Sequence, residues 1–193
     1  MAAKQYIEDK TIDNNNFDTR LFINECQFEN CTFLACDFSS VNISNATFLD
    51  CHFKDCNLSL CKTRDTAFRN IKFTNCKILG VRFDECNLFA LEVGFEHCIL
   101  NDSSFFQLKL KKTEFKNCQL KGVDFVQSDL TSSLFLNCDL DSAVFDNTIL
   151  EKADLSSSIN YAIDPDKNSI KQAKFSLHGL PGLLHKYQIK IVQ

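Results

Sequence analysis

Apolar residues recur at every fifth position over most of the chain. Only Thr63 interrupts the first run, which comprises Ile23, Phe28, Phe33, Phe38, Ile43, Phe48, Phe53, Leu58, Phe68, Phe73, Ile78, Phe83 and Leu88. A five-residue period fits neither the 3.6-residue period of a helix nor the two-residue period of a strand. We therefore expect the chain to turn once in every five residues, with two side chains pointing inward and three outward.

Repetition at a short fixed period predicts an all-β solenoid, in which each unit completes its core only against its neighbours. After a shift of two residues the pattern resumes at Phe95 and alternates strictly between Phe and Leu as far as Leu150. This alternation predicts a four-sided coil of twenty residues, with Phe on two opposite sides and Leu on the other two. At the spacing of neighbouring strands, about seven coils would form a rod of roughly 34 Å.

All eleven cysteines occupy one slot of the repeat, two residues before the central apolar position. Six keep the twenty-residue spacing, with one step of twenty-two, and are expected to form a column inside one side: Cys36, Cys56, Cys76, Cys98, Cys118 and Cys138. The odd count and the constant slot favour reduced, buried thiols over disulfides. Gly94 lies in the shifted segment between Leu88 and Phe95, which should bulge outward, because Gly tolerates unusual backbone angles.

The same geometry argues against catalytic and metal sites. Cysteines that stand side by side do not converge on a tetrahedron as zinc ligands do, and no CxxC pair occurs. An interior thiol also lacks the exposure that a reactive cysteine needs. The four histidines are scattered and expected on the surface: His52, His97, His178 and His185. We expect no cofactor and no enzymatic activity.

The repeat lapses after Leu155. We expect a lead-in over 1–11, the β-helix over 12–155, a polar loop and two closing sides over 156–175, and a C-terminal helix and strand over 176–193. Ser176 is the expected N-cap of a short helix, which Gly179, Pro181 and Gly182 weaken. The tail carries an apolar stripe that can cap the tube or, as we favour, join two copies in a C2 dimer: Leu177, Leu180, Leu183, Leu184, Tyr187, Ile189 and Ile191.

Charge is unevenly distributed along the chain, whose formal net charge is −4. Residues 122–155 contain seven acidic residues against one basic residue, Lys152. These seven form a candidate partner-binding face: Asp124, Asp129, Asp139, Asp141, Asp146, Glu151 and Asp154. The face can simply keep the rod solvated, or it can imitate DNA phosphates for a basic protein saddle. The acidic balance disfavours nucleic acid as a direct partner.

No secretory segment occurs at Met1–Lys10 and no apolar run is long enough to cross a bilayer. We therefore expect a cytoplasmic protein that does not bind membranes.

The repeat resembles the pentapeptide-repeat family, whose consensus is A-(D/N)-L-x-x. It is seen in Cys36-Asp37-Phe38, Cys56-Asn57-Leu58, Cys138-Asp139-Leu140 and Ala153-Asp154-Leu155. The resemblance covers about residues 12–175 and implies a right-handed quadrilateral β-helix.

A narrower similarity is to the Qnr and MfpA-like members, which bind type II DNA topoisomerases and protect them from quinolones. It rests on the opening Thr11-Ile12-Asp13-Asn14-Asn15-Asn16-Phe17, on the last coils from Asn137 to Leu155, and on a Leu183-Leu184 helix followed by an Ile189–Val192 strand. It implies a tail-mediated dimer and DNA gyrase or topoisomerase IV as the partner. Qnr proteins carry two long loops, whereas this chain has only the two-residue insertion. The alternative is a general interaction rod for an unrelated bacterial protein.

Overall fold

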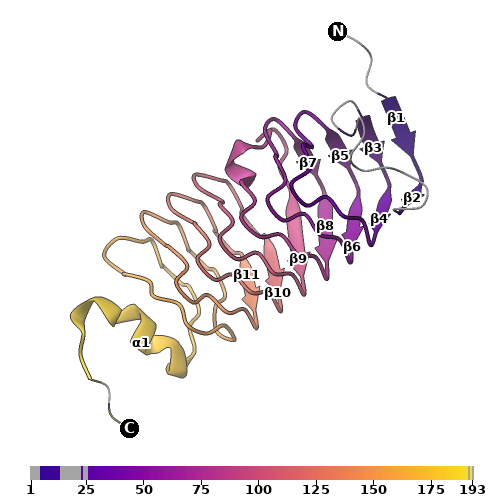
Figure 1. Ribbon diagram of the computed structural model, residues 1–193. Helices are drawn as coiled ribbons and strands as arrows, with labels where there is room; N and C mark the ends of the chain where they lie inside the picture. The colour runs from indigo at the N-terminus through magenta and orange to yellow at the C-terminus, as the bar shows by residue number, and fades with distance from the viewer. Residues whose placement is uncertain (1–4, 14–22, 24–25, 191, 193) are drawn as a thin grey trace.

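The structure is a computed structural model that describes residues 5–13, 23, 26–190 and 192. Two parallel sheets form adjacent sides of a rod. The shorter sheet contains β1 (Gln5–Glu8), β3 (Cys26–Glu29), β5 (Thr47–Leu49) and β7 (Ala67–Arg69). The longer sheet contains β2 (Thr11–Ile12), β4 (Thr32–Leu34), β6 (His52–Lys54), β8 (Ile71–Thr74), β9 (Val93–Glu96), β10 (Glu114–Lys116) and β11 (Leu134–Leu136). The strands stack along the rod in Figure 1.

The sides are numbered here in the order in which the chain visits them. Side 1 is the shorter sheet with Phe28, and side 2 is the longer sheet with Phe33. Side 3 carries Phe38 and side 4 carries Ile43, and isolated parallel bridges join their coils. The protein is thus a four-sided parallel β-solenoid, as the five-residue period predicts.

The strand register confirms the twenty-residue coil and the shift. Phe28 pairs with Phe48, twenty residues later, whereas Phe73 pairs with Phe95, twenty-two residues later. The seven described strands of side 2 span six turns, and bridges from Leu134 to Asp154 and on to Lys174 continue the same side. This length is close to the seven coils that we expected.

The corners of the coil are made by residues in the left-handed conformation. The residue two positions after the central one has a positive φ in almost every repeat, from Asn30 (49°) to Lys152 (59°). Asn, Asp and Gly tolerate this conformation best, but Leu60 (58°) and Lys112 (63°) also adopt it. The backbone N–H of Leu60 donates to the Leu79 carbonyl of the next coil at 2.8 Å, so stacking holds even an unsuitable residue at a corner.

Aromatic rings and thiols fill the interior as predicted. Rings stack along one side, as Phe33 does on Phe53 (4.6 Å), and meet edge to face between sides, as Phe95 does with Phe105 (5.8 Å). All eleven cysteines are free and buried. Each thiol of the six-membered column donates to a carbonyl of the preceding coil, as Cys138 does to Phe115 (3.3 Å). Thr63, which breaks the apolar run, is buried as well and donates to the Arg82 carbonyl (2.6 Å).

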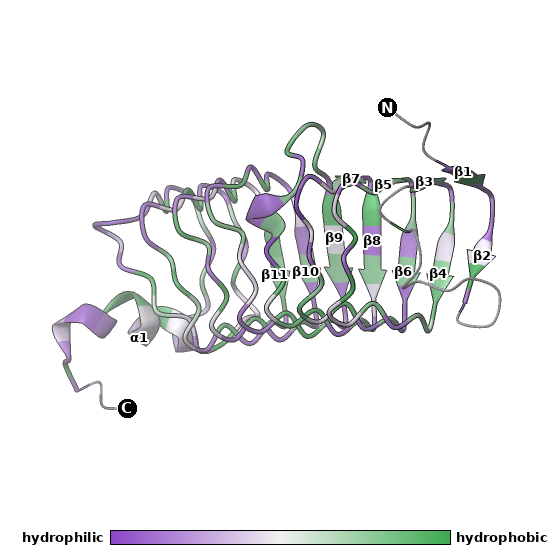
Figure 2. Cartoon of the chain, turned by 45° about the horizontal axis from the view of Figure 1, so that its top comes forward, coloured by the Kyte–Doolittle hydropathy of each residue, from purple (hydrophilic) through white to green (hydrophobic). Residues whose placement is uncertain are grey.

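Two expectations about the insertion are wrong. Leu88 is 56% exposed, because the bulge that follows the 3-10 helix η2 (Phe83–Glu85) takes it out of the core. Phe89 is 74% exposed and lies against the Arg69 guanidinium, whose carbon is 5.4 Å from the ring centre. Gly94 lies in strand β9 without a positive φ, so backbone strain does not explain it. The stack itself continues past the bulge, which Figure 2 shows as an apolar loop rising beside β7.

Stacking also extends further past Leu155 than the pattern predicts. Ile159 bridges Asp139, and both Tyr161 and Ile163 are buried in the interior. The Tyr161 ring lies 5.6 Å from that of Phe175 and closes this end of the tube.

The tail folds back in short helical turns: η3 (Leu177–Gly179), α1 (Leu180–Leu183) and η4 (His185–Tyr187). Ser176 is confirmed as a cap, since its hydroxyl accepts the N–H of Gly179 at 3.0 Å. The terminal strand expected over Ile189–Val192 is not formed at Ile189, Lys190 or Val192, and none of the described strands pairs with these three residues. Ile191 and the opening residues 14–17 lie outside the described residues.

Candidate functional site

The seven acidic residues of the predicted face lie on all four sides of the rod. Bridges and interturn hydrogen bonds place Asp129 and Glu151 on side 1 and Asp154 on side 2. They place Asp139 and Asp141 on side 3, with Asp124 and Asp146 on side 4. The structure therefore brings the seven into neighbouring coils without gathering them on one surface, and their role in binding a partner stays a prediction.

Lysines of adjacent coils pair with four of these carboxylates. The pairs are Lys111–Asp129 (3.2 Å), Lys121–Asp139 (3.0 Å), Lys167–Asp146 (3.7 Å) and Lys174–Asp154 (3.1 Å). All four lysines lie outside residues 122–155, which is why counting charges along the sequence overstates the local negative charge. Asp124, Asp141 and Glu151 form no ion pair with another described residue, and Glu151 accepts a hydrogen bond from Ser169 (2.9 Å).

Three of the paired carboxylates, Asp129, Asp139 and Asp154, are held in their charged form. A hydrogen bond from the Ser156 hydroxyl, aided by Lys174, lowers the pKa of Asp154. Burial alone would raise the pKa of Asp139, but hydrogen bonds from Asn160 and Lys121 outweigh it and the net shift is downward. Asp129 behaves in the same way through Thr131 and Lys111. These groups therefore present fixed negative charge over the physiological pH range.

The apolar tail has one face on the rod and another in solvent. Leu183 packs partly buried against the core, whereas Leu177 is 79% exposed and Tyr187 is 59% exposed. Leu180, Leu184 and Ile189 are exposed as well. The Lys186 ammonium binds Asp164 (2.7 Å) and also Asp166, which fixes the tail to the end of the tube. The tail thus contacts the end of the tube through Leu183 and Lys186, and its other apolar side chains are exposed.

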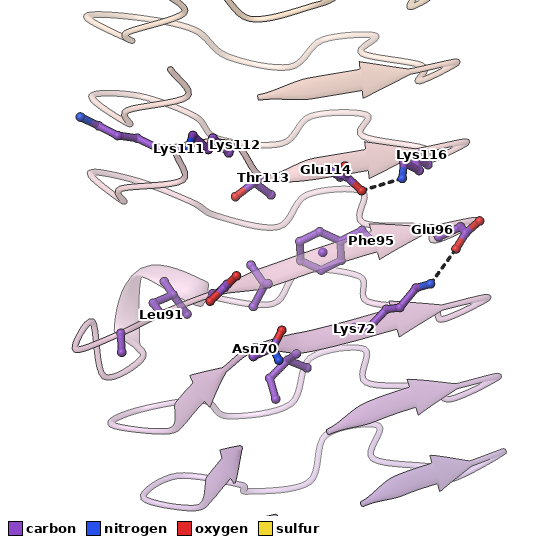
Figure 3. Close-up of a pocket in the computed structure, with 15 residues that line it drawn as sticks. Asn70, Lys72, Leu91, Phe95, Glu96, Lys111, Lys112, Thr113, Glu114 and Lys116 are labelled. Carbon is purple, nitrogen blue, oxygen red and sulfur yellow. Dashed lines mark hydrogen bonds and ion pairs between the residues drawn. The ribbon is translucent and has the colours of Figure 1, made fainter. Parts of the chain in front are cut away.

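A groove that the sequence reasoning missed lies on side 2 beside the insertion (Figure 3). It has a volume of ≈ 580 Å³ and crosses β8, β9 and β10 at Gly94. Two ion pairs flank it, Lys72–Glu96 (3.2 Å) and Lys116–Glu114 (2.6 Å). The sequence feature that could have indicated this groove is Gly94, a glycine at an outward-facing position of strand β9.

Among the remaining titratable groups, one histidine and two buried cysteines have shifted pKa values. Burial lowers the pKa of His52, whose Nε2 lies 2.9 Å from the Thr74 hydroxyl. Burial raises the pKa of both Cys51 and Cys61 to about 12, which keeps these thiols protonated. Among the described residues, no group of three or more His, Cys, Asp or Glu side chains is placed to hold a metal ion.

None of the helices in the described part of the chain has the length and hydropathy needed to cross a bilayer.

The sequence profile described as "Pentapeptide repeat region" matches residues 23–92 and 90–161, well over half of the chain. No curated protein matches the sequence.

Among solved structures, a trypsin-treated variant of QnrB1, described as a plasmid-mediated fluoroquinolone resistance protein, has a TM-score of 0.61 and 18% identity. That match covers 98% of this chain and 100% of the other. HetL, a pentapeptide repeat protein involved in heterocyst differentiation regulation in Nostoc sp. strain PCC 7120, has a TM-score of 0.38 and 13% identity over 78% of this chain and 85% of its own. The likeness to QnrB1 concerns the fold. With the profile match and the twenty-residue register, it makes this chain a member of the pentapeptide-repeat family, with that family's right-handed four-sided β-helix.

Proposed function

We propose that the protein is a non-catalytic interaction rod of the cytoplasm that binds DNA gyrase or topoisomerase IV and alters the response of that enzyme to quinolones. The observation that carries the proposal is the agreement of the rod with QnrB1 over nearly the whole of both chains. Because rings and thiols fill the interior, recognition falls to the outer surface. The description of QnrB1 as a fluoroquinolone resistance protein supports the choice of partner.

The acidic coils would supply the electrostatic part of the contact. Asp141, Glu151 and Asp124 are free of lysine partners within the described structure, and Asp139 lies beside Asp141 on side 3. Cations of a basic saddle would compete with Lys121 and Lys174 for the paired carboxylates. The affinity should therefore fall as salt rises, since exposed charges are screened over ~8–10 Å at physiological ionic strength.

The tail would join two copies and so present two acidic zones about a two-fold axis. Leu177, Leu180, Leu184, Tyr187 and Ile189 are the exposed apolar residues that such a contact would cover. Sedimentation of the full chain should show a dimer, and Leu184→Glu should release monomers. A monomeric wild-type chain at tens of micromolar would remove this part of the proposal.

Gyrase supercoiling with and without ciprofloxacin tests the proposal. The chain should protect or inhibit supercoiling, and replacing Asp139, Asp141, Asp146 and Asp154 by Asn should weaken that effect. The matched control replaces Asp50, Asp55, Asp65 and Asp102 by Asn, which removes equal charge from corner positions outside the acidic coils. No effect of the wild-type chain at high micromolar concentration would refute topoisomerase binding.

The second candidate is an interaction rod for an unrelated bacterial protein. It is favoured by the spread of the seven carboxylates over four sides and by the lysine partners of four of them. A silent supercoiling assay, together with recovery from the native host of a defined protein other than a topoisomerase, would select this candidate.

A further inference from the structure

The tail packs against one buried aromatic residue at the C-terminal end of the rod, where Figure 1 shows α1 beside the last coils. This residue is Tyr161, which is 4% exposed and whose ring lies 5.6 Å from that of Phe175. Two glycines of the tail, Gly179 and Gly182, contact it from the other side. They are three residues apart, so they lie on one face of the helical turns η3 and α1.

The close approach to Tyr161 requires glycine at both positions. A Cβ built on Gly182 would overlap the carbonyl oxygen of Tyr161, and a Cβ built on Gly179 would overlap its hydroxyl oxygen. Neither glycine has a positive φ, so the backbone conformation alone would accept another residue. Glycine is also unfavourable in a helical turn relative to Ala. The contact with Tyr161 is therefore the structural reason for two residues that weaken the helix.

A hydrogen bond joins the tail to the rod beside this contact. The N–H of Ile163 donates to the carbonyl of Gly182 at 3.1 Å. Inside the rod the N–H of a central residue donates to the following coil, as that of Leu155 does to the Lys174 carbonyl at 2.9 Å. The tail thus supplies Ile163 with the acceptor that a further coil would supply. The ion pairs of Lys186 add a second attachment.

This attachment decides which face of the tail is exposed. While the glycines lie against Tyr161, the side chains of Leu177, Leu180 and Leu184 are exposed. These belong to the apolar stripe that a second copy covers in the proposed function. A surface that is already ordered binds at a lower entropic cost than a segment that becomes ordered during association.

We propose that Tyr161 is a positioning residue that locks the tail onto its own rod through Gly179 and Gly182, and so preforms the surface offered to a second copy. These three residues are called the tail lock below. Each tail stays on its own chain in the dimer, because exchange would break the contacts of Tyr161 with both glycines. The inference rests on the dimer of the proposed function and adds the residues that orient its interface.

Gly182→Ala is the test variant, because its added methyl group meets backbone, which cannot turn aside as a side chain can. Gly94→Ala is the matched control, since a Cβ there meets no heavy atom within 4 Å. Hydrogen exchange of the Ile163 amide reports whether the tail is docked, and that of the Leu155 amide reports whether the rod is intact. Sedimentation of the full chain gives the dissociation constant of the dimer.

In Gly182→Ala the Ile163 amide should exchange at least about 10-fold faster than in the wild type, while exchange of the Leu155 amide changes little. The dissociation constant should rise about 10-fold or more, because the released tail must be ordered on binding. Gly94→Ala should match the wild type in all three measurements. Leu184→Glu should dissociate the dimer and leave the Ile163 amide protected, which separates the tail lock from the interface.

A second pair of variants tests the contact itself. Gly179→Ala should also release the tail, because its Cβ overlaps the Tyr161 hydroxyl oxygen. Adding Tyr161→Phe removes that oxygen and leaves the ring carbon Cζ, 2.6 Å from the Cβ position, as the nearest atom. The double variant should therefore regain part of the Ile163 protection and of the dimer affinity. A general loss of stability would not be reversed by shortening one side chain.

Three results would overturn the tail lock. The first is a wild-type Ile163 amide that exchanges as fast as an exposed one, and the second is a Gly182→Ala chain that dimerises as tightly as the wild type. The third is loss of Ile163 protection in Leu184→Glu, which would show that the partner copy orders the tail. A monomeric wild-type chain with a protected Ile163 amide would instead refute the dimer and support the lock.

Discussion

The two stretches of the rod on either side of the insertion use one repeat but arrange their cores differently. In residues 26–86, Phe columns occupy the adjacent sides 1 and 2, and both sides form strands. In residues 93–155, Phe columns occupy the opposite sides 2 and 4, and only side 2 forms strands. The second column changes sides at Phe83, whose ring stacks on Phe105 at 4.8 Å.

Both arrangements satisfy the same packing requirement. Phe28 and Phe33, on adjacent sides, meet edge to face at 5.0 Å, and Phe95 and Phe105, on opposite sides, do so at 5.8 Å. Edge-to-face contact is favourable for aromatic rings in either case. The coil thus needs two ring columns in contact and two thinner columns beside them, and it accepts more than one placement of the pair.

The largest expected effect comes from removing one ring from each stretch. Phe53→Ala and Phe115→Ala should each lower the free energy of unfolding by about 3–5 kcal/mol, because both rings are fully buried and each contacts four others. Urea titrations of both variants measure the losses. Similar losses would support equivalent packing, whereas a loss below 1 kcal/mol in one stretch would show that its rings are loosely held.

The next largest loss of folding stability should come from raising the pH, and it should arise mainly in the stretch before the insertion. That stretch holds eight of the eleven cysteines, and burial raises the pKa of Cys51 and Cys61 to about 12. A thiol whose folded pKa is raised stabilises the fold fully below its ordinary pKa near 9, and the contribution is lost as pH rises toward 12. Thiol labelling between pH 8 and 11 should therefore increase as the fold opens and these two cysteines ionise.

Cys51→Ser serves as the control for alkaline opening. Ser or Thr fills the same inward slot elsewhere, as Thr66 and Ser103 do, and donates to the preceding coil at 2.8 and 2.7 Å. The variant should fold and open at a higher pH than the wild type. Fast labelling of Cys51 in the wild type at pH 8 would contradict the buried, protonated thiol.

A smaller effect is expected from joining the two stretches directly. Deleting Phe89 and Ala90 restores an unbroken five-residue pattern and allows Leu88 into the core of side 1. Burying this side chain should raise the free energy of unfolding by ~1–2 kcal/mol, somewhat less than the full value for Leu because the Arg69–Phe89 contact is lost. Thermal unfolding compares the two chains, and a lower midpoint would show that the bulge is needed where the ring columns change sides.

The smallest effect is expected from the interturn ion pairs, which are concentrated in the second stretch. Lys121→Gln or Lys174→Gln should cost less than about 1 kcal/mol, because both pairs are largely solvent-exposed. The lowered pKa of Asp154 means that its contribution is present above its ordinary pKa near 4 and is lost as pH falls through the lowered value. Acid titration of Lys174→Gln should accordingly be flatter than that of the wild type.

Sequence reasoning predicted the coil, its register and its core because all three depend on one strict period. The Cys36 to Cys138 column and the Phe73–Phe95 step follow from spacing alone. Leu88 was misplaced because two inserted residues can be accommodated at several points between Leu88 and Phe95. Tyr161 was missed because it enters the core one residue after the expected slot, at Asn160.

The candidate surfaces were less predictable for a geometric reason. Residues that touch across coils are twenty apart, so Lys121 and Asp139 belong to one ion pair although their segments differ in charge. Whether Asp129 and Asp139 share a surface depends on the side that each occupies, which a charge count ignores. The groove at Gly94 depends on what its neighbours in the column carry, and this emerges only when the coils are aligned.

The constant register along side 2 has a consequence for length. Phe95, Phe115 and Phe135 repeat at twenty-residue steps, so a whole coil can be removed or added between them without turning any surface toward a new direction. Each such step changes the separation of the groove at Gly94 from the C-terminal tail by about 4.8 Å. The distance between two contact surfaces on the rod can therefore be changed in fixed steps of one coil, by natural variation or by design.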